Sequence, residues 1–376
     1  MSSLALVPYT FSLLKLPFIA LQNVSDCLNP FEIYHFSRIS KKTNKLAKTI
    51  SKKATQIYLT SPFSASITFN KKESWSFKPT IEPGPDSYTV HSDTSGPTQS
   101  RHGYGFFSKK PASEVLRVLE WVMDLFKNSI VQLSFDSRSS NRQDLISHFN
   151  WFLENPSEVP LVSMKCSDAE DIQFFIENYK KPSKKLNLLF NLENEEELEL
   201  PDNLETNLFE EVEIHTSHPV NFNLYNIFRG SIIFSMEAKL TNQDLNTFLK
   251  NWQSGLTNSH WRNVCFNMIG QVNLINILDG ITATYRDPRT VKRQISMAKE
   301  SFWIFGGIDI QKHDGTATAT VQWKEYKVEN EDSEVPDKLI REYERNQESG
   351  EIQRHEEGEL TFERFLELHR FSMYIW

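Results

Sequence analysis

Six short apolar segments recur through the middle of the chain, and their spacing restricts the fold more than any other feature of the sequence. Their centres lie near residues 133, 163, 188, 212, 233 and 266, about 21 to 33 residues apart. Each segment is bounded by polar or turn-forming residues, as a buried β-strand is. The sequence therefore predicts strands that repeat at the length of one supersecondary unit.

Helix-period segments separate several of these strands. Residues 113–126, 168–179 and 241–254 each place apolar side chains at i, i+3, i+4 and i+7. Asp168 is a plausible cap for the second segment, and Thr241, with Asp244 three residues later, is one for the third. The predicted buried stripe of the third segment consists of Leu245, Phe248, Leu249 and Trp252.

The alternation of strand and helix predicts an α/β body. Its repeat length fits a leucine-rich-repeat-like β-α solenoid, in which each unit buries its apolar face against its neighbours. The strict leucine-rich consensus is missing, and a doubly wound open sheet would produce the same alternation. Both architectures stay open at this point.

The C-terminal third predicts a closing hairpin and a helix. Apolar and polar residues alternate on both sides of Asp314-Gly315 within residues 302–328, which indicates an antiparallel hairpin that closes the last repeat. Residues 329–360 are strongly acidic and indicate a solvated helix or linker. Residues 360–376 return to helix periodicity through Phe362, Phe365 and Leu366, so we expect a C-terminal helix.

The N-terminal sixty residues have a different character. These residues include eight lysines and arginines but only two acidic residues, Asp26 and Glu32, so their net charge is +6. Because the whole chain has a net charge of -8, the remainder carries -14. The lysines from 41 to 53 carry much of this charge, and they are either a patch for nucleic acid phosphates or a solvated helix face. Aromatic residues are not interleaved with these lysines, so we favour the solvated face and expect no nucleic acid partner.

Residues 78–103 collect prolines and glycines with little apolar periodicity. We therefore expect a flexible loop or linker between the N-terminal helices and the body. Cys27, Cys166 and Cys265 lie about a hundred residues apart, which predicts a reducing compartment, cytoplasmic or nuclear, without disulfides. Neither a secretory signal nor a membrane-spanning segment is predicted, since Pro8 and Pro17 interrupt the apolar start and no apolar run is long enough.

Residues with the chemistry of catalysis are not grouped in the sequence. His215 and His218 follow Glu211 and Glu213 and make a metal site conceivable, but a loop after a strand explains this spacing better. Cys166 and Cys265 lie in apolar segments and are expected to be small buried side chains. We predict a non-catalytic protein with no cofactor and no metal.

The stretch from Leu16 to Leu46, "LPFIALQNVSDCLNPFEIYHFSRISKKTNKL", resembles an F-box. Ile19 stands where an acidic residue is common in that module, and Thr43 where a Trp is common. The sequence of this stretch is similar to that of the nematode-type F-box family, whose members carry a type 2 F-box-associated domain. Residues 239–268 and "IFGGIDIQKHDGTATATVQ" carry that second resemblance, and together the motifs span about a quarter of the chain.

The resemblance implies a substrate-recognition subunit of a Skp-cullin-F-box ubiquitin ligase. The F-box would dock the Skp adaptor and through it the cullin, and the repeat body would bind an unknown target protein. Pro17, Ala20, Pro30 and Phe31 are expected to stay exposed until a partner covers them, because so small a bundle cannot bury all its apolar residues. The residues implied in adaptor binding are Leu16, Pro17, Ala20, Leu21, Val24, Leu28, Asn29, Pro30, Phe31 and Phe36.

These expectations divide the chain into four parts. They are an F-box at 12–56, a strand and flexible linker at 57–110, a repeat body with the F-box-associated domain at 111–328, and an acidic segment with a C-terminal helix at 329–376. The alternative function is a repeat-type protein-interaction module that works outside ubiquitination.

Overall fold

The fold was obtained as a computed structural model, and its described residues form two compact units. The first unit consists of the residues up to Asp136 together with residues 141–159. The second unit consists of residues 137–139 together with the residues from Pro160 onward. The described residues are 15–70, 73–93, 99–139, 141–155, 158–190, 209–216, 228, 230–238, 240–257, 260–268, 273–297, 300–322, 328–348 and 369–376.

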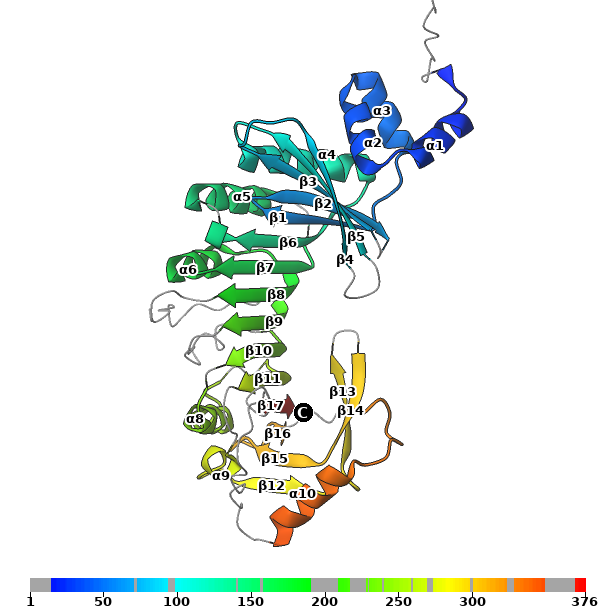
Figure 1. Cartoon of the computed structure of the whole chain (residues 1–376). Helices are drawn as coiled ribbons and strands as arrows, with labels where there is room; N and C mark the ends of the chain where they lie inside the picture. Colours follow the sequence, from blue (N-terminus) through cyan, green and yellow to red (C-terminus); the bar gives the residue numbers. More distant parts are fainter. Residues whose placement is uncertain are drawn as a thin grey trace, which may run out of the picture. The chain divides into compact units, whose positions relative to one another are not determined.

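The first unit begins with three short helices (Figure 1), which are α1 (Phe18–Cys27), α2 (Pro30–Arg38) and α3 (Lys41–Ile50). Asn29 caps α2 in a capping box with Glu32, and Pro30 occupies the first helical position, where its missing N–H is not needed. Ser40 and Thr43 form the same kind of box at α3. Two capped starts within a dozen residues explain why this segment forms two short helices rather than one long one.

A mixed sheet follows these helices in the first unit, with the strand order β6-β1-β2-β3-β5-β4. The β1–β2, β2–β3 and β4–β5 pairs are antiparallel, and the β1–β6 and β3–β5 pairs are parallel. The strands are β1 (Gln56–Ser61), β2 (Ser64–Asn70), β3 (Glu73–Thr80), β4 (Ser87–Asp93), β5 (Gln99–Phe107) and β6 (Ile130–Asp136).

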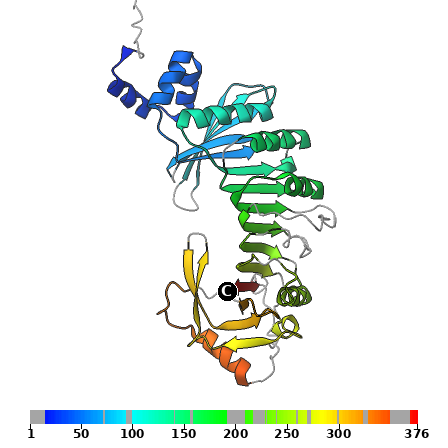
Figure 2. The same cartoon turned by 180° about the vertical axis from the view of Figure 1, so that it is seen from behind.

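Helix α4 (Pro111–Phe126) covers one face of this sheet, and α5 (Arg142–Glu154) packs beside it (Figure 2). Ile57, Ile67 and Leu119 are completely buried where the two layers meet. The opposite strand positions carry mostly polar side chains, among them Ser66 on β2 and Ser76 on β3, and face away from α4, as the period-2 alternation of a half-buried strand requires.

The flexible linker expected at residues 78–103 is wrong for most of its length. Residues 87–93 and 99–107 are strands, and β5 pairs with β3 along eight residues. Tyr104 and His102 lie on the face that carries Trp75 and Phe77, and ring contacts join them. Along β5, aromatic side chains alternate with glycines, and this alternation is too weak a hydrophobic pattern to predict a strand. In the sheet, the aromatic rings lie on one face and the glycines on the other.

The second unit has the strand order β12-β15-β16-β17-β11-β10-β9-β8-β7. The strands β7 to β11 are parallel along the pairs β7–β8, β8–β9, β9–β10 and β10–β11, as strands joined by crossovers are. These strands are β7 (Leu161–Cys166), β8 (Ser183–Phe190), β9 (Phe209–Thr216), β10 (Ile232–Ala238) and β11 (Asn263–Met268). With β6 in the first unit, all six predicted strands are confirmed.

The three helices predicted at 113–126, 168–179 and 241–254 are confirmed as well, the first of them as α4. Helix α6 (Ala169–Asn178) starts after the Asp168 cap, and α8 (Asn242–Gln253) starts with the Thr241–Asp244 capping box. The body is therefore strand-rich α/β. The connections after β8 and β9 lie mostly outside the described residues, so a complete solenoid stays a prediction.

The C-terminal part of the second unit differs from expectation in one element. The hairpin around Gly315 is confirmed as β15 (Gly307–Gln311) and β16 (Thr318–Gln322). However, residues 369–375 form a strand, β17 (His369–Ile375), and not part of a helix; residues 361–368, which include Phe362, lie outside the described residues. Since β17 pairs with both β16 and β11, it is this strand and not the hairpin that borders the parallel strands.

Shorter elements complete the second unit. The strands β13 (Lys292–Met297) and β14 (Glu300–Phe305) form a separate two-stranded ribbon, and β12 (Ala283–Arg286) pairs with β15. Helix α10 (Asp337–Glu348) lies in the acidic segment, α9 (Leu274–Ile277) contacts α8, and η2 (Ser137–Ser139) is a single 3₁₀ turn. The helices in the described part of the chain are all too short or too polar to cross a membrane.

Candidate functional site

The residues expected to bind an adaptor lie just before α1, on α1 and α2, or between these helices, but they do not share one exposed face. Pro17, at the cap position of α1, is exposed, and Leu21 is buried. The half-buried members of the set are Leu16, Ala20, Val24, Leu28, Asn29 and Phe36. No described contact tests their role toward a partner, so adaptor binding through these residues stays a prediction.

The expectation that Pro30 and Phe31 stay exposed is wrong, because both side chains are buried. Phe31 is 4% exposed and contacts four rings of the sheet at centroid distances of 5.0 to 5.9 Å. These rings belong to Trp75, Phe77, Tyr88 and Tyr104 on β3, β4 and β5. Only Tyr88 lies within the linker expected at 78–103, since Trp75 and Phe77 precede that range and Tyr104 follows it.

The exposed apolar residues of the helices are different ones. Phe18 and Ile19 at the start of α1 are 51% and 74% exposed, and Ile39 after α2 is 73% exposed. Sequence reasoning missed them because Leu21, Val24 and Leu28 already supplied an apolar stripe. The available signal was an excess of apolar residues over what one face of a ten-residue helix can bury.

Polar contacts hold the three helices together and to α4. Ser25 donates to the Ile50 carbonyl over 3.1 Å, and Ser51 donates to the Leu125 carbonyl over 2.6 Å. The Trp121 indole N–H donates to Ser37 over 2.9 Å. The helices are therefore anchored to the first unit through both α2 and α3.

The lysines of this region are partly paired with carboxylates. Lys48 lies 2.5 Å from Asp124, and Lys52 lies 2.9 Å from Asp26. Lys41, Lys42 and Lys45 are exposed on α3. Ion pairs within the unit and solvent exposure fit the solvated face that we favoured over a nucleic acid site.

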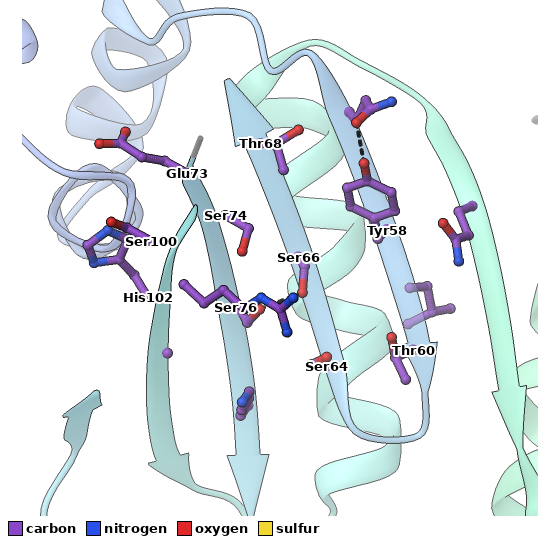
Figure 3. Close-up of a pocket in the computed structure, with 16 residues that line it drawn as sticks. Tyr58, Thr60, Ser64, Ser66, Thr68, Glu73, Ser74, Ser76, Ser100 and His102 are labelled. Carbon is purple, nitrogen blue, oxygen red and sulfur yellow. Dashed lines mark hydrogen bonds between the residues drawn. The ribbon is translucent and has the colours of Figure 1, made fainter. Parts of the chain in front are cut away.

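A second feature of the first unit is a polar hollow of about 830 Å³ on the sheet face opposite α4 (Figure 3). It crosses β1, β2, β3 and β5, and its labelled side chains are mostly serines and threonines that stand between the strands. Ser66 and Ser76 meet at its centre with 2.7 Å between their hydroxyl oxygens. The sequence analysis did not single out this surface. Its hydroxyl residues, Ser100 excepted, lie before the linker expected at 78–103, in a segment that shows no motif of a binding site.

The conceivable metal site near His215 is an ion-pair group. His215 lies 3.0 Å from Glu213, and Lys185 lies 2.6 Å from both Glu211 and Glu213. Hydrogen bonds from His215 and Lys185 lower the pKa of Glu213 to about 2 despite its partial burial. His218 lies outside the described residues, and no cluster of three or more potential ligands for a metal ion occurs in the part of the chain that the structure describes.

Cys166 and Cys265 are buried as expected, and all three cysteines are free thiols.

Neither a curated protein nor a solved structure matches the chain. The model of the F-box domain family matches residues 13–55, which contain α1, α2 and α3 with their two capping boxes. The nematode-type family and the type 2 F-box-associated domain stay predictions. The three N-terminal helices of this chain are therefore found to be an F-box domain.

Proposed function

We propose that the chain is the substrate-recognition subunit of a Skp-cullin-F-box ubiquitin ligase. F-box proteins typically bind the Skp adaptor and thereby the cullin, and they are generally non-catalytic. In this role the chain would raise the effective concentration of a target near the ubiquitin-carrying enzyme, in the cytoplasm or the nucleus.

The observation that carries the proposal is the exposed apolar pair Phe18 and Ile19 within the F-box. Two adjacent large apolar side chains are costly to leave in water, and an adaptor that covers them would recover that free energy. We further propose that Pro17 and the half-buried residues Leu16 and Ala20 complete this contact.

The rest of the chain supports the recognition half of the proposal. Buried contacts of Phe31 and Ser51 join the F-box to the sheet and to α4 within the first unit. A target bound to the sheet or to α4 would therefore be held at a defined place relative to the adaptor. We propose that the α/β body works as a repeat-like scaffold with a type 2 F-box-associated domain, on the strength of the motifs at 239–268 and 304–322.

The test is co-purification of the full chain with the Skp adaptor, followed by titration of an Ile19→Asp variant. A charge at the centre of an apolar contact is expected to weaken adaptor binding by about thirtyfold or more, the cost of losing an interface hot spot. Leu21→Asp is unsuitable because Leu21 is buried and its replacement would unfold the domain.

The control is Leu256→Asp, since Leu256 is also 74% exposed but lies in the second unit. It is expected to bind the adaptor as the native chain does. A native chain that fails to bind would overturn the ligase role, and equal binding by the Ile19→Asp variant would place the contact elsewhere. In the first case the chain is better described as an interaction module outside ubiquitination.

A further inference from the structure

The sheet of the first unit ends in a strand whose outer side is open. Strand β4 pairs with β5 and with no other described strand. The strand that ends the sheet of the second unit, β12, has only four residues, ends in Arg286 and contacts α10. By contrast, β4 has seven residues and contains neither lysine nor proline, which commonly prevent an edge strand from pairing with another chain. The β4 edge is therefore a template for one more strand.

The backbone of β4 presents hydrogen-bonding groups at this edge. A Cβ atom at Gly103 would lie 3.9 Å from the Thr89 Cβ, and one at Gly105 would lie 3.9 Å from the Ser87 Cβ. Cβ atoms this close across two antiparallel strands are typical of a non-hydrogen-bonded pair, whose N–H and C=O groups point away from each other's strand. The backbone groups of Ser87 and Thr89 therefore point outward from β5, where no described strand meets them.

Two partly exposed apolar side chains lie along the same edge. Tyr88 is 53% exposed and Val90 is 51% exposed. They are two residues apart in a strand, so both lie on the face of the sheet against which α2 packs. The Tyr88 ring centroid lies 5.9 Å from that of Phe31, and its hydroxyl lies 2.7 Å from Nδ1 of His102. Contacts within the unit thus fix the edge in place while half of each apolar side chain stays in water.

The sequence of β4 is complementary to itself in the antiparallel direction. When Thr89 lies opposite Thr89 of a second copy, Tyr88 lies opposite Val90 of that copy and Ser87 lies opposite its His91. Aromatic with β-branched residues, and threonine with threonine, are favourable cross-strand pairs. Residues 87–92 contain no Asp, Glu, Lys or Arg, so this register brings no like charges together although each chain carries -8. A two-fold axis at Thr89 therefore matches backbone, apolar side chains and charge at once.

We propose that the chain forms a symmetric dimer in which β4 pairs antiparallel with β4 of a second copy, centred on Thr89. The sheets of the two first units then continue as one, and each copy covers the Tyr88 and Val90 side chains of the other. A two-fold axis perpendicular to the sheet keeps both copies of α2, and so both F-boxes, on the same face. Each copy contributes one β4 edge, so the assembly closes at two chains. This inference does not depend on the proposed ligase role.

The experiment is analytical ultracentrifugation of the full chain, without adaptor, over a range of protein concentrations. The contact is one strand wide and smaller than the roughly 1,600 Å² of a standard interface, so we expect a dimer that dissociates in the micromolar range. The average mass should rise with concentration from that of one chain toward twice that value. It should not rise further.

Charge variants at the two-fold centre test the register. Thr89→Lys and Thr89→Glu should each weaken dimerisation by about fivefold or more, because each sets two like charges directly opposite one another. An equimolar mixture of the two variants should recover native association, since a Lys then faces a Glu. Ile81→Lys and Ile81→Glu are the controls, because Ile81 is 67% exposed but precedes the paired residues, and they should associate as the native chain does. Val90→Glu tests the same contact without a change at Thr89 and should also weaken it.

A native chain that stays monomeric at every concentration overturns the proposal, even if an extended segment of another protein binds the same edge. Association that is unchanged in the Thr89 and Val90 variants would place the contact elsewhere and would overturn it too. Growth beyond two chains would mean that strands add without a closing two-fold axis, which also contradicts the proposal. If the Thr89 variants fail to fold, the native chain and the Val90→Glu variant decide the question.

Discussion

At the scale of single residues, His148 shows how a buried polar side chain is fully satisfied. Its Nε2 lies 2.7 Å from the Ala112 carbonyl, and its Nδ1 lies 2.8 Å from the Ser61 hydroxyl. A carbonyl can only accept, so Nε2 carries the proton and Nδ1 accepts from Ser61. Both side chains are buried, so this Ser-His pair joins β1 to α5 and α4 and is closed to a substrate.

His148 predicts a loss of stability at acidic pH. Burial lowers its pKa below the ordinary value of 6.5, although the Ala112 carbonyl and Asp144 act in the opposite direction. The unfolded chain therefore binds the proton first, so the stability is complete above about pH 6.5 and falls as the pH drops toward the folded-state pKa.

The measurement is urea denaturation of the native chain and of a His148→Gln variant between pH 7.5 and 5. The variant is expected to be less stable at pH 7.5 and to lose less stability on acidification. Burial also lowers the pKa of His35, so the comparison between the two proteins isolates His148. Parallel pH profiles would contradict the assignment.

At the scale of elements, α2 is an F-box helix that also packs its buried face against the sheet. Its start is set locally by the Asn29–Glu32 capping box, which the sequence displays. Its buried face is set by the sheet: Tyr34 packs on Phe77 with 4.9 Å between ring centroids, next to Phe31. A helix that is fixed from inside the unit leaves α1 to present the exposed apolar residues.

Phe31→Ala is accordingly expected to destabilise the first unit by about 3 to 5 kcal/mol, because it removes a buried ring and leaves a cavity among the neighbouring aromatic rings. Phe18→Ala should change the free energy of unfolding by no more than about 0.5 kcal/mol, since that side chain is half in solvent. Urea denaturation followed by circular dichroism checks both. Similar losses in the two variants would mean that α2 is not seated on the sheet.

At the scale of the whole molecule, the C-terminal strand shows how distant segments complete one layer. Strand β17 pairs with β11, about a hundred residues earlier, and with β16 on its other side. Phe371 and Met373 are completely buried there. Within the second unit the C-terminal residues are thus an interior strand of the sheet and not a helix docked onto it.

This placement predicts that Phe371→Ala destabilises the second unit by about 3 to 5 kcal/mol. Leu256→Ala, at an exposed position of the same unit, should alter stability by no more than about 0.5 kcal/mol. Hydrogen exchange should show matching loss of protection in β11 and β16 of the Phe371 variant. Unchanged protection in those strands would rule out the pairing.

The sequence by itself determined the elements whose signal is local. Capping boxes at Asn29 and Thr241, the turn at Gly315 and the apolar runs of β6 to β11 can be recognised because each depends on residues a few positions apart. The F-box was recognisable for the same reason, since its helices are short and adjacent in the chain.

Only the tertiary structure decided which residues face a partner and which face the protein itself. Phe31 is buried because strands beyond residue 70 bring Phe77 and Tyr104 to it, and β17 is a strand because β11 and β16 supply its hydrogen bonds. The contact between the Ser66 and Ser76 hydroxyls likewise exists only through cross-strand register. Pairing between distant segments leaves no periodic trace in either segment alone, so a single sequence cannot display it.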